Sequence, residues 1–187
     1  YTYLWSDGQT SATATNLAAG TYTCTVTDDG TKQWNLNYIE NFQGVVGAEW
    51  TENSTNTYRG NTILGEFNSN ATGLPTLNLA GLPAHDSIRV VLEMYAFDTW
   101  NGNSTNWGPD LWTLAVDNDT LLHTTFSGRN SSQSFPDNYP AIYPEGEGAF
   151  ADSIDKLNSS HDNTLKFFFN YSSLHSNNTA SINLTDR

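Results

Sequence analysis

"NLAAGTYTCTV", residues 16–26, alternates strictly from Tyr22 onward. Tyr22, Cys24 and Val26 fall on one face of an extended chain and threonines fall on the other, because successive side chains of a strand point to opposite faces. No stretch of the chain keeps the 3.6-residue period of a helix. Further segments typical of strands lie at 33–42, 87–97, 110–116, 120–126, 164–171 and 179–185. The sequence therefore predicts an all-β fold.

Two parts of unequal size are expected along the chain. Turn residues cluster at 28–32, "DDGTK", which is typical of a junction. Roughly nine strands after this point predict a jelly-roll-type β-sandwich over residues 33–187. Its segment 87–97, "SIRVVLEMYAF", is apolar on both faces and is expected to be a central, buried strand. Residues 1–32 form a separate, partial β segment in this interpretation.

The segment 1–30 also resembles a known family. Leu17, Gly20, Tyr22 and Cys24 have the spacing of a tyrosine corner, in which a Tyr precedes a core Cys by two residues. The segment resembles the second half of the SprB-type repeat of Bacteroidota surface adhesins through Tyr3, Leu4, Trp5, Gly8, Leu17, Gly20, Tyr22 and Asp28. This resemblance implies part of an immunoglobulin-like module. Residues 33–187 resemble uncharacterised extracellular β-sandwich modules of large bacterial surface proteins. We expect both ends of the chain to be cut, or to be completed by other segments.

Charge and composition exclude several classes of partner. The net charge is −13 with only seven Lys and Arg, so the chain lacks the basic surface that nucleic acids or anionic membranes require. No apolar run is long enough to span a membrane. The single cysteine, Cys24, excludes an intramolecular disulfide. Charged residues make up only 14% of the 187 residues and Asn, Ser and Thr are abundant, which favours an extracellular, cell-surface location.

Acceptor triplets for N-glycosylation, Asn-X-Ser/Thr, occur about twice as often as this composition predicts by chance. They begin at Asn53, Asn70, Asn103, Asn118, Asn130, Asn158, Asn170, Asn177 and Asn183. Most fall where turns or strand ends are expected, which is where a glycan is tolerated. The alternative is that polar turns are simply rich in these residues.

The segment 97–112, "FDTWNGNSTNWGPDLW", is the candidate binding loop. Asp98, Asn101 and Asp110 supply oxygen ligands of the kind that Ca²⁺ prefers. Trp100 and Trp107 offer aromatic faces for sugar rings. The alternative is a loop stabilised by Asx turns, with its tryptophans packed as a lid on the core.

We do not expect an enzyme. Glu145 and Glu147 lie on a glycine-flanked loop, but a glycosidase needs two carboxylates across a cleft, and a loop cluster is usually solvated. The four histidines show no metal spacing. The sequence favours a non-enzymatic extracellular module, a protomer of a glycosylated surface filament or adhesin stalk that assembles with copies of itself by strand complementation. The residues Tyr22, Cys24 and Val26 mark the expected assembly strand. The alternative is a Ca²⁺-assisted carbohydrate-binding module.

Overall fold

The computed structural model describes residues 2–18, 20–27, 34–67, 75–97, 99–128, 130–149, 155–156 and 163–186. Every regular element in these ranges is a strand, which confirms the predicted all-β class. The same ranges contain no helix long and apolar enough to cross a membrane. The chain divides into two compact units, Tyr1–Leu36 and Asn37–Arg187, which are described separately.

Unit 1 is a two-stranded hairpin. Strand β1 (Thr2–Trp5) pairs antiparallel with β2 (Cys24–Thr27), so that Trp5 stands opposite Cys24 and Tyr3 opposite Val26. Gln9 organises the long connection, because its side chain donates to Thr15 O and accepts from Thr15 N, both at 3.0 Å. The alternation read from the sequence is present, since Tyr22 and Cys24 are half-buried whereas Thr23 and Thr25 are exposed.

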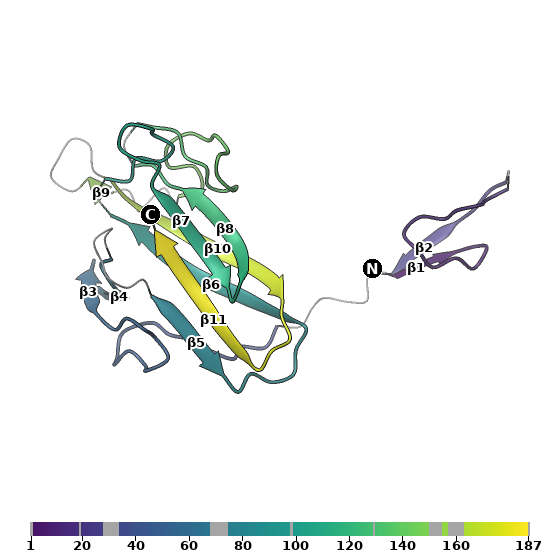
Figure 1. Ribbon diagram of the computed structural model, residues 1–187, viewed down its shortest axis with the longest axis horizontal. Coiled ribbons are helices and arrows are strands. Elements are labelled where there is room, and N and C mark those ends of the chain that lie inside the picture. Colours follow the sequence, from purple (N-terminus) through teal and green to yellow (C-terminus); the bar gives the residue numbers. More distant parts are fainter. Residues whose placement is uncertain are drawn as a thin grey trace. The chain divides into compact units, whose positions relative to one another are not determined.

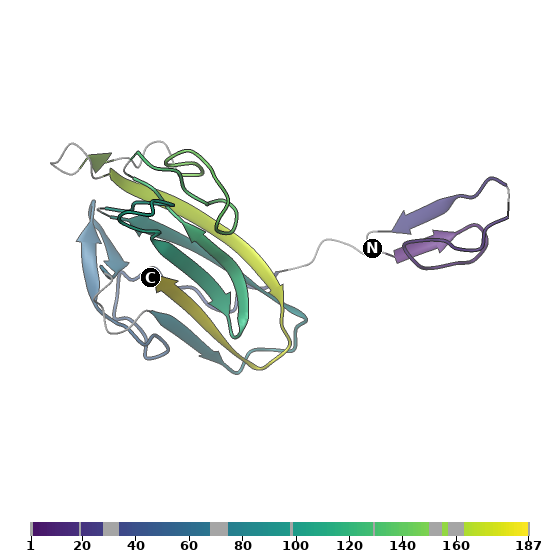
Figure 2. The ribbon, with the colours of Figure 1, turned by 45° about the horizontal axis from the view of Figure 1, so that its top comes forward.

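Unit 2 is β-sandwich-like, with two sheets face to face (Figures 1 and 2). One sheet has the order β5 (Thr76–Ala80), β11 (Thr179–Asp186), β7 (Leu111–Val116), β8 (Asp119–Thr125). The other has the order β6 (Ser87–Ala96), β10 (Asn163–Leu174), β9 (Asp155–Lys156). A separate hairpin, β3 (Thr55–Tyr58) and β4 (Asn61–Leu64), packs its Tyr58 ring against Tyr95 of β6 at 5.1 Å.

An aromatic cluster between the sheets forms the core. The period of two along β7 buries Trp112, Leu114 and Val116 and leaves the intervening residues partly exposed. Phe126, which follows β8, is fully buried at the centre of the cluster. The rings packed on it, with centroids between 4.4 and 6.1 Å away, belong to Trp100, Trp112, Phe135, Phe167 and Phe169. Both sheets and two loops therefore meet at one side chain.

Both outer strands of the four-stranded sheet are covered by coil. Along β8, Tyr139 N donates to His123 O at 2.7 Å and Phe135 N donates to Thr125 O at 3.2 Å. Along β5, Asn78 N donates to Glu49 O at 2.8 Å and Thr51 N donates to Thr76 O at 3.0 Å. Such cover removes the unpaired backbone groups that would attract a further strand.

Two expectations about strands were wrong. Residues 34–42 of the segment expected as a strand belong to no sheet, and they are instead held through Tyr38, whose hydroxyl accepts from Trp50 Nε1 at 2.7 Å. Burial of that hydroxyl raises the pKa of Tyr38 to about 12. Strand β6 is not central, since it stands at the end of its sheet in the described residues and leaves Val91 52% exposed. The prediction of a central strand was wrong because β6 carries apolar residues, such as Val91, on a face that is exposed.

Two adjacent phenylalanines of β10 test this assignment of faces. Phe167 is fully buried and Phe168 is 44% exposed on the opposite face. We expect Phe167→Ala to lower the free energy of unfolding by about 3–5 kcal/mol, because it leaves a cavity in the aromatic cluster. The matched Phe168→Ala change should cost about 1 kcal/mol or less. Urea unfolding of the two variants measures the difference, and equal losses would contradict the assignment.

Candidate functional site

The tryptophans of the candidate binding loop have different environments. Trp100 packs edge-on against Phe126 with a centroid distance of 5.6 Å, and Trp112 is 6% exposed, so both belong to the core. Trp107 is 81% exposed. Of the two tryptophans predicted to bind sugar, Trp100 thus takes the place of a lid on the core, and only Trp107 presents a free face.

The predicted cation ligands are engaged within their own loop. Asp98 lies outside the described residues. Asn101 Nδ2 donates to Thr99 O at 3.0 Å, and Asn101 N donates to the carboxylate of Asp110. In the part of the chain that the structure describes, no group of three or more His, Cys, Asp or Glu side chains could hold a metal ion. The calcium site stays a prediction, and these bonds fit the alternative of an Asx-stabilised loop.

A buried amide holds the neighbouring loop, of which the structure describes residues 127–128 and 130–149. Gln133 is fully buried. Its Oε1 accepts from Ser127 N at 3.1 Å and from Gly146 N at 3.0 Å. Its Nε2 donates to Phe135 O at 3.1 Å and to Glu147 O at 2.9 Å. One side chain thereby satisfies four backbone groups, so this loop is rigidly held without strands.

Asn103 links this loop to the tryptophan loop. Its Nδ2 donates to Ala141 O at 2.8 Å, and the Thr125 hydroxyl donates to its Oδ1. Ser134 Oγ lies 2.9 Å from the same Oδ1. The amide of this acceptor triplet is therefore turned into the protein.

The remaining acceptor asparagines separate by exposure. The exposed ones are Asn53, Asn118, Asn130, Asn170 and Asn177. Asn183 is half-buried, and its amide bonds to Thr76 Oγ1 and Ser181 O at 3.1 and 3.2 Å. Asn70 and Asn158 lie outside the described residues. Exposed acceptors are thus spread over loops and strands of unit 2.

The acidic loop considered for catalysis has structural partners. Glu145 accepts from Asn130 N at 2.7 Å, and Glu147 is exposed. Tyr143 donates its hydroxyl to Asp137, and this bond raises the pKa of Tyr143 because ionisation would remove the donated proton. These side chains therefore bond to other residues of the same loop.

The expected assembly strand pairs first within its own chain. Strand β2 has β1 as its neighbour, and neither strand has a second neighbour within the described residues. Tyr3, Trp5, Tyr22 and Cys24 are half-buried, and Leu4 is 57% exposed. The connection covers the outer edge of β1 at Trp5, since Trp5 N donates to Gln9 O and Gly8 N donates to Trp5 O, both at 2.9 Å. The edge without a neighbouring strand in the described part of unit 1 is therefore chiefly that of β2.

The sequence shows no metal spacing among the histidines, and it gave no sign of one arrangement that the fold creates. His175 is 9% exposed and lies beside His85, with Asp117 on its other side. Ninety positions separate the two histidines, so no local motif could show their contact.

Comparisons with protein-family models, with curated proteins and with solved structures give no match to this chain.

The geometry of Asn103 generates a test of glycosylation. If the chain is glycosylated in its native source, we expect glycans on Asn118 and Asn130 and none on Asn103, because a sugar on Asn103 Nδ2 would break the bond to Ala141 O. Glycopeptide mass spectrometry measures the occupancy of each site. An occupied Asn103 would contradict this arrangement of the two loops.

Proposed function

We propose that this chain is a non-enzymatic extracellular structural module, a protomer of a glycosylated surface filament or adhesin stalk. The observation that carries the proposal is the contrast between the two units. Unit 2 covers both outer strands of its four-stranded sheet, although β6 stands at the end of the other sheet, whereas in unit 1 the strand β2 has only β1 as a neighbour in the described residues. Open edges are the places where strands of other chains add.

The hairpin needs a partner for its apolar face. An isolated two-stranded hairpin is marginally stable in water. Trp5 and Cys24 stand opposite each other and Tyr3 lies on the same face, yet each of the three is only half-buried. A strand from a second copy would extend the sheet at the edge of β2, and side chains of that copy would then pack over this face. The predicted strand of Tyr22, Cys24 and Val26 is then the assembly strand.

The geometry of such a contact favours a filament. A strand donated by one copy to a different surface of the next is a heterologous contact, and such contacts build open chains unless the rotation closes. Exposed acceptor asparagines on unit 2 would place glycans on the outside of the assembly. A net charge of −13 keeps such surfaces from associating without specific strand pairing.

A pair of tryptophan variants tests assembly. We expect the wild-type chain to form oligomers at micromolar concentration and Trp5→Ala to be monomeric, because the ring on the open face is lost. Trp5→Phe should restore oligomers in part. The matched Trp107→Ala change, at an exposed ring of unit 2, should leave the oligomers intact. Analytical ultracentrifugation measures the state, and a monomeric wild type that remains folded would refute the proposal.

The second candidate is a Ca²⁺-assisted carbohydrate-binding module, which is favoured by the 81% exposure of Trp107. We expect binding of a ligand on a glycan array to fall about fivefold or more in Trp107→Ala, if a sugar ring on the indole contributes on the order of 1 kcal/mol or more, as other rings stacked on aromatic side chains do. The same binding should disappear with a chelator. Binding that is unchanged by both treatments, or absent across a broad array, would refute this candidate.

A further inference from the structure

The two long strands β6 and β10 expose apolar side chains on the face of their sheet that is turned away from the core, called here the β6–β10 face. Phe168 of β10 is 44% exposed on this face, although both of its neighbours in sequence are fully buried. Val91 of β6 is 52% exposed. The Tyr58 ring of β3 covers the same face at Tyr95, with a centroid distance of 5.1 Å, so the exposed apolar part lies away from that hairpin.

An acceptor asparagine stands in this exposed part. Asn170 of β10 is paired directly opposite Val91. Phe168 lies two residues before it and Ser172, the third residue of its acceptor triplet, lies two residues after it. Because side chains of a strand alternate between faces, all three share the β6–β10 face, with Cα atoms about 7 Å apart along the strand. All three are exposed.

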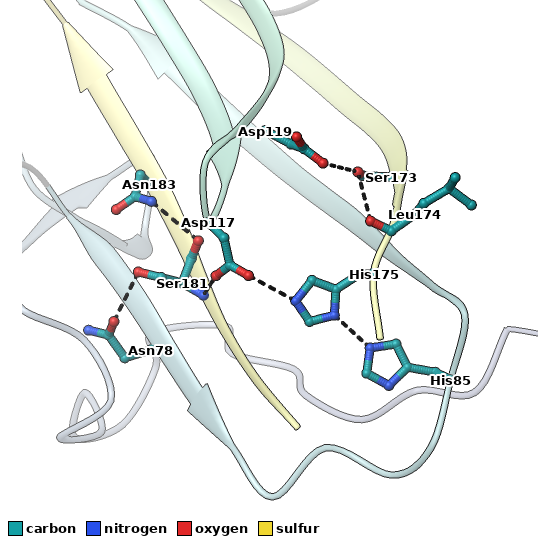
Figure 3. A network of polar contacts seen from close by, with 9 residues as sticks. All are labelled: Asn78, His85, Asp117, Asp119, Ser173, Leu174, His175, Ser181 and Asn183. Atoms are coloured by element: carbon teal, nitrogen blue, oxygen red, sulfur yellow. Dashed lines mark hydrogen bonds and ion pairs between the residues drawn. The ribbon is translucent and has the colours of Figure 1, made fainter. Parts of the chain in front are cut away.

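This arrangement distinguishes Asn170 from the other acceptors. It is the only one of the nine with a Phe, Tyr or Trp two residues earlier. Asn183 offers the comparison, since it also lies in a strand, β11. There the residue two positions earlier is Ser181, and Asn183 Nδ2 donates to Ser181 O at 3.2 Å (Figure 3). The nitrogen of Asn183 is therefore engaged, and no ring lies beside it on its own strand.

Arg89 sets the orientation of the Asn170 amide. Its Nε donates to Asn170 Oδ1 at 2.7 Å. Since a guanidinium can only donate, the amide oxygen faces Arg89 and the amide nitrogen is turned from it. Arg89 is paired opposite Ser172, so it stands on one side of Asn170 along the strand and Phe168 stands on the other. The nitrogen that would carry a sugar is thus turned from Arg89, and the Phe168 ring lies on the side away from Arg89.

Glycosylation keeps this orientation. In N-glycan transfer, Nδ2 of the asparagine forms a bond to C1 of the first sugar and loses one proton, while C1 is released from the lipid diphosphate that carried the glycan. The oxygen Oδ1 takes no part in the new bond, so it can still accept from Arg89. One face of a sugar ring presents C–H groups, which pack well on the electron-rich face of an aromatic ring. Phe168 is within reach of the first sugar, because it is the next residue on the same face.

The size of the apolar area suits a sugar better than a partner protein. A specific protein interface buries at least about 1,000 Å². Here Phe168 and Val91 form a small apolar centre bordered by polar groups. Lys166 and Glu93 form an ion pair at 2.9 Å on one side of it, and Arg89 lies on the other. One or two sugar rings would cover this centre.

We propose that Asn170 carries an N-linked glycan whose first sugar packs on the Phe168 ring and covers the apolar centre of the β6–β10 face. This inference rests on the proposed function, a glycosylated surface module, and it adds a role for one glycan. A covered β6–β10 face is closed to other chains, which leaves association to unit 1.

The test compares full-length chains with and without the Asn170 glycan. Ser172→Ala removes the acceptor triplet and leaves Asn170 and its bond to Arg89 in place. Thr120→Ala is the matched control, because it removes the triplet of the exposed Asn118, which has no aromatic residue two positions earlier. The chains are secreted from a eukaryotic host that attaches N-glycans, and an endoglycosidase trims each glycan to its first sugar. Glycopeptide mass spectrometry measures the occupancy of each site.

We expect Asn170 to be occupied, and Ser172→Ala to lower the folding equilibrium constant about threefold to tenfold in urea unfolding, the range of a contact between two rings. The effect should vanish when Phe168→Ala is also present, because the ring is gone. Thr120→Ala should change the constant less than about twofold. The same variants from a bacterial host without N-glycosylation give the effect of the substitutions alone, and there Ser172→Ala should act no more strongly than Thr120→Ala.

An unmodified Asn170 would overturn this proposal, and an occupied Asn118 in the same chain would show that the glycosylated module itself stands. An effect of Ser172→Ala that persists without the Phe168 ring, or that is equally large in the chain without glycans, would also overturn it. A monomeric wild type refutes assembly through unit 1 and has no bearing on Asn170, so the two proposals fail separately.

Discussion

Phe126 holds unit 2 together. Its ring is fully buried, and the rings around it come from β7, β10, the tryptophan loop and the segment after β8. Such contacts combine large buried areas with preferred ring geometries, so they fix how elements lie as well as holding them. The two sheets are positioned across this ring, and the loops that carry Trp100 and Phe135 end against it. Each loop therefore has one aromatic residue packed on Phe126, and the rest of the loop must be held by other contacts.

Hydrogen bonds of amide and hydroxyl side chains hold the rest of these loops. Gln133 and Asn103 satisfy backbone and side-chain groups of several loop segments from partly or fully buried positions. Neutral groups suit this place, because burying a charge costs more than burying an amide whose hydrogen bonds are all made. The chain has 14% charged residues and many Asn, Ser and Thr. The abundance of Asn, Ser and Thr alone would indicate only a polar surface. Some of these polar residues are instead used inside the loop region, where they form hydrogen bonds.

The sequence could predict the elements whose pattern is local. Segment 110–116 is predicted as a strand and forms β7 (Leu111–Val116), and the predicted alternation of Tyr22 and Cys24 with threonines is seen in unit 1. The strand prediction for 34–42 failed because Leu36 and Ile39 are left exposed, at 76% and 75%, and no strand pairs with the segment, which is attached through single contacts such as the hydrogen bond from Trp50 to Tyr38. The place of β6 failed because residues such as Val91 are tolerated on an exposed face. His85 and His175 are brought together only by the fold, so their contact has no local signal in the sequence.

The two units solve the problem of stability differently. An isolated two-stranded hairpin is marginally stable in water. Cys24 is the only cysteine of the 187 residues, so they form no disulfide with one another. In the described part of unit 1, no group of three or more His, Cys, Asp or Glu side chains could hold a metal ion, and Tyr3, Trp5 and Cys24 are only half-buried. The outer edge of β2 is where a further strand could pair. In the proposed assembly, the half-buried face of this hairpin forms one side of an interface.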